Sequence, residues 1–390
     1  MGKKYAFASS LIYFIVVCIF VTIRMLNHFH LLSFLGDYGS YIVNGILQVG
    51  ILFFFSIFMF KYLTKRSLKK TLYNFSYTKV SFRVILISIG LGVVVYFLNI
   101  FVASFFNAIL SSVGYEFSSS SSSASVSIWT LILGLIFTAI LPAICEENLH
   151  RGMLLFGNTG LGMKNNILLT GLMFGLLHMN IEQFFYATII GIFLNFVLYI
   201  TESIYPCMII HFMNNGIGVL LSYLTNANVI QGGLFTKLNE LLISNAAVGF
   251  VVMLIIVLVL VFLLFYLVRL LIKYSFEDGF KAKQKAVQQL ATRVGFFSDI
   301  EKIKNGENVD EDSVLSNSDK QLAFLSFDEL KEKIKENPEN FVVQKPKKEK
   351  METRTKILLI ASIVLMSAVT LFTFIWGLLW WQLILFVWEI

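Results

Sequence analysis

The sequence predicts an all-α membrane protein: a polytopic transmembrane helical bundle of about eight or nine spans, with a cytoplasmic insert that is part helical and part disordered. Of its 390 residues, 57% are hydrophobic and only 14% are charged, whereas soluble domains are about a quarter charged. The chain has 39 Phe and only 4 Pro, and apolar runs of about 20 residues, long enough to cross a bilayer, recur along it. Cys18, Cys145 and Cys207 are too scattered for a disulfide framework. A soluble enzyme, a disordered protein and a secreted disulfide scaffold are therefore excluded.

Nine apolar runs are candidate spans. They cover residues 5–23, 41–60, 84–106, 128–145, 165–180, 183–200, 206–224, 247–268 and a run that starts at 357. The fifth is short for a full crossing, and the last is long enough for one tilted span or for a span plus a re-entrant segment. We expect six regions along the chain: a three-span region (1–110), a Ser-rich external loop (111–127), a central core (128–224), an additional span (225–272), a charged cytoplasmic insert (273–356) and a C-terminal hydrophobic span (357–390).

The distribution of positive charge predicts the orientation. If the N-terminus is inside, 29 of the 31 Lys and Arg residues fall in cytoplasmic segments, and only Arg24 and Lys237 fall outside. Such a bias indicates that the N-terminus and residues 269–356 are cytoplasmic. The formal net charge of +7 therefore reflects membrane topology, and no nucleic-acid partner is expected. The expected partner of the whole chain is the lipid bilayer.

Ionisable residues in the apolar core are scarce and concentrated. Only eight acidic residues lie outside the insert, and two of them, Glu146 and Glu147, are adjacent and directly follow the run 128–145. Three of the five histidines, His150, His178 and His211, lie in the same central block. Ionisable groups at membrane depth are costly unless they are paired or hydrated, so these residues are candidates for function.

Helical spacing brings these residues into pairs. Residues four apart share a helix face, which pairs each glutamate with the residue one turn later and places Asn215 one turn after His211. Short connections at 180–183 and 201–205 make the neighbouring helices antiparallel and close. Taken singly, these residues are also typical of a structural ion pair or of interhelical hydrogen bonds. The pairs are Glu146 with His150, Glu147 with Arg151, and His211 with Asn215.

Three motifs in order then resemble a known family. Residues 146–152 fit EExxxRG, residues 174–178 fit FxxxH and residues 211–215 fit HxxxN. Together they resemble the CPBP family of intramembrane proteases, also called the CAAX-protease and bacteriocin-processing (Abi) family, which includes the Ras-converting CAAX endopeptidases. The resemblance covers roughly residues 128–224, which we therefore expect to be the catalytic core. His150 departs from the pattern, because the family commonly has an aromatic residue there.

The residue types suit peptide hydrolysis, which needs an activated water, a stabilised oxyanion and a proton for the leaving amine. We expect Glu146 with His178 to hold and deprotonate the water, and His211 with Asn215 to stabilise the oxyanion. The resemblance implies the same roles. Supporting positions are expected for Glu147, Arg151 and His150, the role of His150 being open.

A metal site is the alternative chemistry. Glu146, His178 and His211 would make a zinc site of two histidines and a glutamate, and the family is often labelled as metalloproteases. The sequence contains no HExxH motif. The favoured interpretation is metal-free glutamate and histidine chemistry that requires no cofactor.

The predicted function is that of an intramembrane endopeptidase acting on membrane-associated peptides or protein C-terminal regions, lipidated or not. Because the run 128–145 ends at Glu146 on the inner side, we expect the cavity to open towards the cytoplasm. The abundance of the family in bacteria favours a bacterial cytoplasmic membrane. Two alternatives are a non-catalytic immunity or scaffold protein of the same family and a proton- or cation-coupled transporter. The transporter is disfavoured because the chain shows no paired halves with broken helices.

Overall fold

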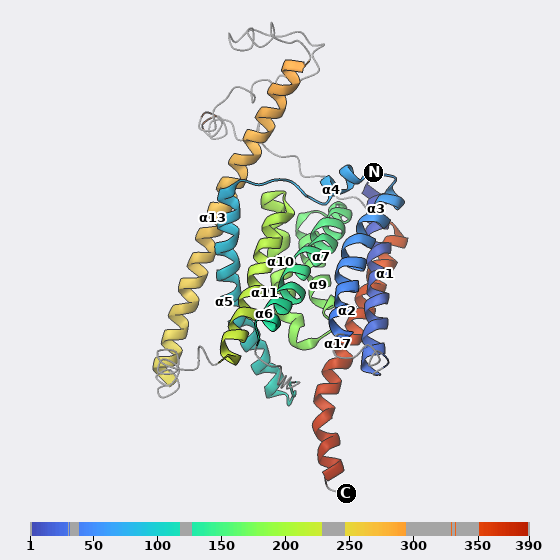
Figure 1. The fold of residues 1–390 in the computed structure, drawn as a ribbon, viewed down its shortest axis with the longest axis vertical. Helices are drawn as coiled ribbons and strands as arrows, with labels where there is room; N and C mark the ends of the chain where they lie inside the picture. The colour runs from blue at the N-terminus through green and yellow to red at the C-terminus, as the bar shows by residue number, and fades with distance from the viewer. Residues whose placement is uncertain are drawn as a thin grey trace. The chain divides into compact units, whose positions relative to one another are not determined.

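The computed structural model describes residues 2–29, 31, 39–117, 127–227, 246–293, 329, 332 and 351–388. The elements in these ranges are helices, with no strand among the described residues (Figure 1). Within the described ranges, eight helices are long and apolar enough to cross a membrane, which confirms the predicted all-α polytopic bundle. They are Lys3–Asn27, Tyr41–Thr64, Phe82–Ser112, Ile128–Gly157, Ile181–Thr201, Ile204–Asn226, Ala247–Gly279 and Thr353–Trp376.

The chain divides into two compact units, residues 1–269 with 347–390 and residues 270–346. Helix α13 (Ala246–Arg293) runs from the first unit into the second. Most of the predicted insert, including residues 294–328 and 333–350, lies outside the described residues, as do residues 118–126 of the predicted Ser-rich loop. For the C-terminal run, the sequence allowed either one span or a span plus a re-entrant segment. The run forms the single helix α17 (Thr353–Trp388).

The second and fourth spans are long helices that contain π-helical segments. The second consists of α2 (Gly39–Gly45), η2 (Ile46–Phe55) and α3 (Ser56–Thr64). The fourth consists of α6 (Ile128–Gly134), η3 (Leu135–Ile140), α7 (Leu141–Glu147), η4 (Asn148–Leu154) and α8 (Leu155–Gly157). Such segments place an extra residue in a turn and are frequent at functional sites. In this protein they flank the residues predicted to carry the chemistry.

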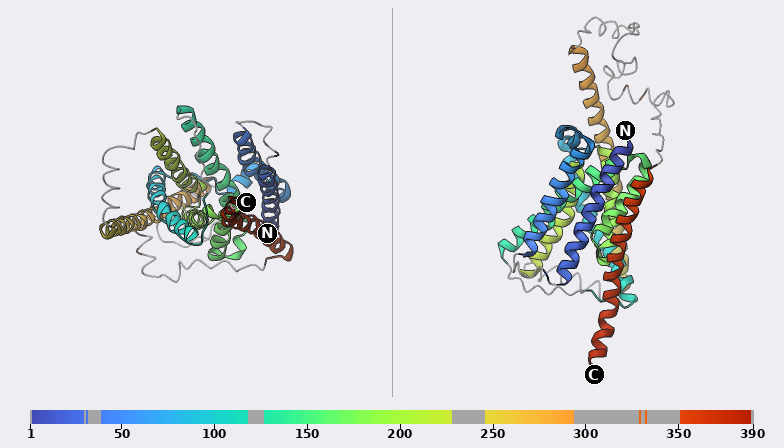
Figure 2. Two further views of the ribbon diagram at one scale, coloured as in Figure 1. Left: turned by 90° about the horizontal axis from the view of Figure 1, so that it is seen from below. Right: turned by 90° about the vertical axis from the view of Figure 1, so that its right-hand side faces the viewer.

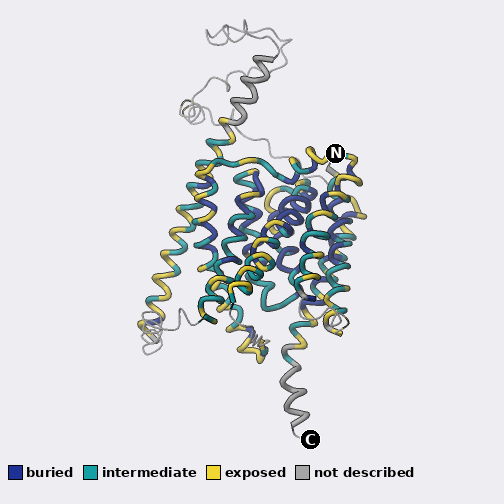
Figure 3. Tube along the Cα trace, in the orientation of Figure 1, coloured by how far each residue is buried: buried dark blue, intermediate teal, exposed yellow. Residues whose placement is uncertain are grey.

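The remaining helices of the first unit surround the fourth span. They are α1 (Gly2–His28), α4 (Leu68–Asn74), α5 (Phe82–Ser112), η5 (Thr159–Leu161), α9 (Met163–Leu177), α10 (Ile181–Thr201) and α11 (Ile204–Asn226). Helix α17 lies along α1 (Figure 2). Buried residues gather where α1 meets the fourth span and α9 (Figure 3). The core there includes Tyr13, Phe60, Leu149 and Met173, each fully buried.

Helix α9 is the candidate span that does not qualify as a crossing. It has 15 residues and therefore rises only about 22 Å. The helix ends at Leu177, and His178 is its C-cap. Met179 then takes a positive φ of 49°. The side chain of Asn180 caps the start of α10 by accepting from the backbone N–H of Glu182. His178 thus occupies a tight turn within the bundle.

Glycines let α9 and α10 approach each other closely. A Cβ on Gly175 would lie 2.0 Å from Thr188 Oγ1, and a Cβ on Gly171 would lie 2.5 Å from Ile192 Cγ1. These two glycines are spaced as in the GxxxG pattern of tightly packed membrane helices. The close approach sets the position of α10 behind the candidate site.

Candidate active site

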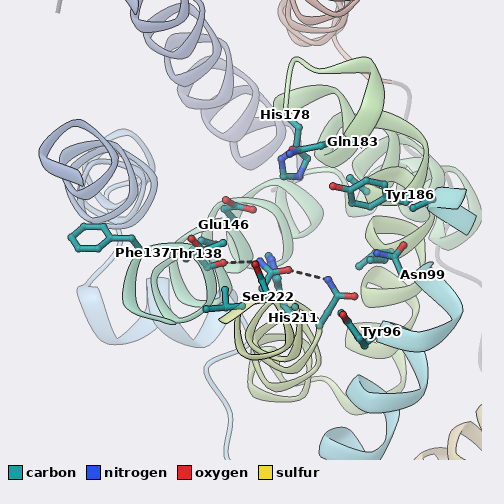
Figure 4. A pocket seen from close by; sticks show the side chains of 18 of the residues that line it. Tyr96, Asn99, Phe137, Thr138, Glu146, His178, Gln183, Tyr186, His211 and Ser222 are labelled. Atoms are coloured by element: carbon teal, nitrogen blue, oxygen red, sulfur yellow. Dashed lines mark hydrogen bonds between the residues drawn. The ribbon is translucent and has the colours of Figure 1, made fainter. Parts of the chain in front are cut away.

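A cavity of about 830 Å³ lies among the helices of the first unit, and four predicted site residues line it (Figure 4). Glu146 comes from α7, His178 from the end of α9, and His211 and Asn215 from successive turns of α11. The structure therefore brings together all four residues predicted to be catalytic. The three predicted supporting residues do not line the cavity and are buried behind it: Glu147, His150 and Arg151.

Two hydrogen bonds hold Glu146, one to its side chain and one to its backbone. Its Oε1 accepts a hydrogen bond from Gln48 Nε2 at 2.9 Å, and its backbone carbonyl accepts one from His150 Nδ1 at 2.9 Å. Gln48 comes from η2, so the second and fourth spans meet at this carboxylate. Glu146 also lines the cavity.

Glu147 forms a buried charge cluster with Arg151 and His211. Its Oε1 accepts from the guanidinium of Arg151 at 2.9 Å and lies 2.7 Å from His211 Nδ1. Glu147 is 0% exposed and Arg151 is 1% exposed. Since Glu147 is paired with a guanidinium, it acts as an acceptor, so His211 donates through Nδ1. The opposite ring nitrogen, Nε2, is the one that can act in the cavity.

The guanidinium of Arg151 is held on three sides. It donates to Glu147 and, at 2.9 Å, to the carbonyl of Gly191 on α10. It also lies over the ring of Phe174, 4.4 Å from the centroid, a favourable cation–π contact. A Cβ on Gly191 would lie 2.9 Å from the carbonyl of Gly171, so the close packing of α9 and α10 brings this carbonyl to the arginine.

The ring of Phe174 packs against two imidazoles of the site. The rings of His178 and His211 lie 5.4 Å and 5.8 Å from its centroid, both nearly perpendicular to it. His178 lies one turn after Phe174, as the FxxxH spacing predicts. The aromatic residue of this motif therefore packs against the arginine and against both histidines.

Asn215 is anchored by a backbone carbonyl of the fourth span. In an α-helix the carbonyl of Thr138 would accept from the N–H of residue 142, but that residue is Pro142 and has no N–H. Asn215 Nδ2 donates to this carbonyl at 3.0 Å, and Asn215 Oδ1 accepts from Asn214 at 2.9 Å (Figure 4). One N–H of the Asn215 amide remains available to the cavity.

His150 belongs to a structural network outside the cavity. Because a carbonyl only accepts, its Nδ1 donates to the backbone of Glu146, and its Nε2 lies 3.3 Å from the hydroxyl of Tyr13. That hydroxyl also donates to the carbonyl of Met173 at 2.9 Å. The ring packs at right angles to Phe174. His150 thus links α1, α9 and the fourth span.

Sequence reasoning missed two amides beside the motif. Asn148, fully buried, donates to Ser56 Oγ at 2.8 Å and accepts from Tyr77 at 3.0 Å, so it joins the fourth span to the second. Gln48 holds Glu146. Each amide stands within or directly after a long apolar segment, and this isolation was the available signal.

The candidate metal ligands do not form a metal site in this arrangement. Among the residues that the structure describes, no three His, Cys, Asp or Glu side chains lie close enough to hold a metal ion. Glu146, His178 and His211 are accordingly not arranged as a zinc site of two histidines and a glutamate in the part of the chain that the structure describes.

The lining of the cavity extends from Glu146 away from the N-terminal ends of the first unit. The fourth span continues to Gly157, so Glu146 lies near its middle and not at its inner end. The lining extends to Thr130 in the first turn of α6 and to Asn226 at the end of α11. These ends lie at the bottom of Figure 1, away from the N-terminus. An opening towards the cytoplasm stays a prediction, although the fourth span runs on beyond the glutamates at which its apolar run was expected to end.

The comparison with known proteins gives a family for this part of the chain. Residues 128–217 match the model of the family described as "Type II CAAX prenyl endopeptidase Rce1-like". The resemblance that the three motifs carry is thereby confirmed for these residues. No curated protein and no solved structure matches the chain. The match and the apolar helices support an integral multi-pass membrane protein with a CAAX-type protease domain.

Proposed function

We propose that the protein is an intramembrane endopeptidase that hydrolyses peptide bonds of membrane-associated peptides or of protein C-terminal regions. The observation that carries the proposal is the convergence of Glu146, His178, His211 and Asn215 on one cavity within the Rce1-like region. A general base and oxyanion donors around one space are the minimum that amide hydrolysis needs.

Glu146 and His178 activate the water. A water held between the free oxygen of Glu146 and the imidazole of His178 loses its proton to the carboxylate as it attacks the scissile carbonyl carbon. The same proton then passes to the leaving amine. The hydrogen bond from Gln48 keeps the carboxylate oriented, which matters because general base catalysis depends on position before it depends on acidity.

His211 and Asn215 stabilise the oxyanion. Asn215 offers its second amide N–H, its first being fixed on Thr138. His211 offers Nε2 as the second donor, because its Nδ1 is bound to Glu147. Each such donor contributes about 2.7–4 kcal/mol of transition-state stabilisation. Glu147 and Arg151 act through His211 and are positioning residues.

The proposed chemistry is metal-free. Active protein treated with a chelator and analysed for metal content tests this part. Full activity with substoichiometric metal supports it, and stoichiometric zinc whose removal abolishes activity overturns it.

Glu146→Gln tests the proposed function in cells. The variant keeps an oxygen that accepts from Gln48, so the fold is expected to be retained, while the general base is lost. Membranes from cells with the wild type and with the variant are compared for peptides with new termini. We expect termini that depend on Glu146 to disappear, with at least a 100-fold loss of cleavage, as is typical of the loss of a general base.

Glu182→Gln is the matched control. Glu182 accepts a hydrogen bond from Tyr115 at 3.1 Å and is not in the lining of the cavity, so its cleavage pattern should equal that of the wild type. Identical termini for the wild type and Glu146→Gln, with both proteins folded, would contradict the proposal and favour a non-catalytic scaffold or immunity protein.

A further inference from the structure

The walls of the cavity mix apolar and polar side chains and are almost uncharged. In the described lining, Glu146 is the one acidic residue, and no Lys or Arg is present. Amide side chains from four helices face the space. Besides Asn215, they are Asn44, Gln48, Asn99, Gln183, Asn214 and Asn226. Amides both donate and accept hydrogen bonds, so they match the alternating N–H and C=O groups of an extended backbone better than they match a charged side chain.

Two of these amides hold unused acceptors. Gln48 is 7% exposed and its Oε1 has no hydrogen-bond partner, although its Nε2 binds Glu146. Asn214 Oδ1 is likewise buried without a partner, although its Nδ2 binds Asn215. Buried acceptors without partners are rare and costly in folded proteins. Both side chains line the cavity beside the proposed base and oxyanion donors.

The distribution of charge decides from which side such a segment arrives. The lining reaches Asn44 near the start of the second span, Ala103 in the second half of α5, Thr130 at the start of α6 and Asn226 at the end of α11. Successive spans cross the membrane in opposite directions, so these four positions lie towards the same face of the membrane. The residues that connect the spans at the other face, 61–83, hold seven Lys and Arg, and by the positive-inside rule that face is cytoplasmic.

We propose that the cavity admits an extended, uncharged peptide segment from the non-cytoplasmic face of the membrane, and binds it through its backbone beside Glu146. This inference rests on the proposed function for the hydrolytic step, but the side of entry does not. The volume of about 830 Å³ is in the range of small-ligand sites. The substrate class is therefore a short, unfolded stretch of an exported or membrane-inserted protein and not a folded domain.

Thiol labelling in intact cells tests the side of entry. Ser222 lines the cavity near the end of α11 and is exposed, and Lys70 is exposed on the opposite connection. We expect a membrane-impermeant maleimide to label Ser222→Cys in intact cells, and Lys70→Cys only after permeabilisation. The wild type, whose Cys145 and Cys207 are buried and whose Cys18 is partly buried, gives the background. Labelling of both variants from the same side, the reverse pattern, or no labelling of Ser222→Cys even after permeabilisation would each overturn the proposal.

The termini that depend on Glu146 test the substrate class separately. We expect them to lie in non-cytoplasmic segments whose residues next to the cut are uncharged. Cuts confined to cytoplasmic segments would overturn this inference and leave the proposed function standing. External labelling of Ser222→Cys without any cut that depends on Glu146 would support the side of entry and refute the proposed function.

Discussion

Removing the carboxylate of Glu147 is expected to destabilise the protein more than any other single change at the site. Its Oε1 accepts two hydrogen bonds, from Arg151 at 2.9 Å and from His211 at 2.7 Å, and both ends of the ion pair are almost fully buried. A hydrogen bond to a charged group contributes about 1.5–3 kcal/mol. Breaking a buried pair by deleting one partner costs about 3–5 kcal/mol.

For Glu147→Ala we therefore expect the free energy of unfolding to fall by about 3–5 kcal/mol. The Gly191 carbonyl and the Phe174 ring remain beside Arg151, but neither carries a neutralising charge. The assay is denaturant unfolding of the detergent-solubilised protein, followed by tryptophan fluorescence and analysed by linear extrapolation.

Two controls separate this cause from general loss of packing. The double variant Glu147→Leu with Arg151→Leu removes both charges and should recover most of the loss, because replacing a buried pair by apolar residues is often neutral. Glu182→Ala, which removes one hydrogen bond from Tyr115, should cost about 1 kcal/mol. A loss below about 1 kcal/mol for Glu147→Ala, or a double variant as unstable as the single one, would refute the reasoning about a buried charge.

Three further substitutions probe the framework of the site. Pro142→Ala supplies an N–H at the position from which an α-helix would bond the Thr138 carbonyl, so this N–H should compete with the amide of Asn215, lower the rate of cleavage about tenfold and leave stability within about 1 kcal/mol; unchanged kinetics would contradict this. Gly175→Ala places a Cβ 2.0 Å from a side-chain oxygen of α10, whereas at Gly50 the nearest atom is at 3.9 Å, so only the former should lose about 1–3 kcal/mol in denaturant unfolding. His150→Phe keeps the aromatic packing but loses two polar contacts, and should lower stability by about 1–3 kcal/mol while cleavage persists; loss of activity in a folded variant would assign His150 a direct role.

Whether a contact in the site could be predicted depends on how far apart its two residues lie in the sequence. The pairs within one helix could be predicted, because the spacing of Glu147 and Arg151, or of His211 and Asn215, sets which side chains share a face. The links between distant helices could not be predicted. Gln48 lies 98 residues from Glu146, and Tyr13 lies 137 residues from His150, so no local pattern connects them.

By itself, the sequence indicated that this chain is a membrane protein, which segments are candidate spans and which residues are candidates for chemistry. It could do so because hydropathy, helical period and charge asymmetry are properties of short sequence segments, and these properties decide whether a segment crosses the bilayer and in which direction. Only the tertiary structure decided that Glu146 faces the cavity while Glu147 is buried behind it, and that the cavity extends away from the N-terminal side. Those outcomes depend on how α5, α10 and α11 pack around the fourth span. Adjacent glutamates on one helix look alike in the sequence, and only the packing of the neighbouring helices distinguishes them.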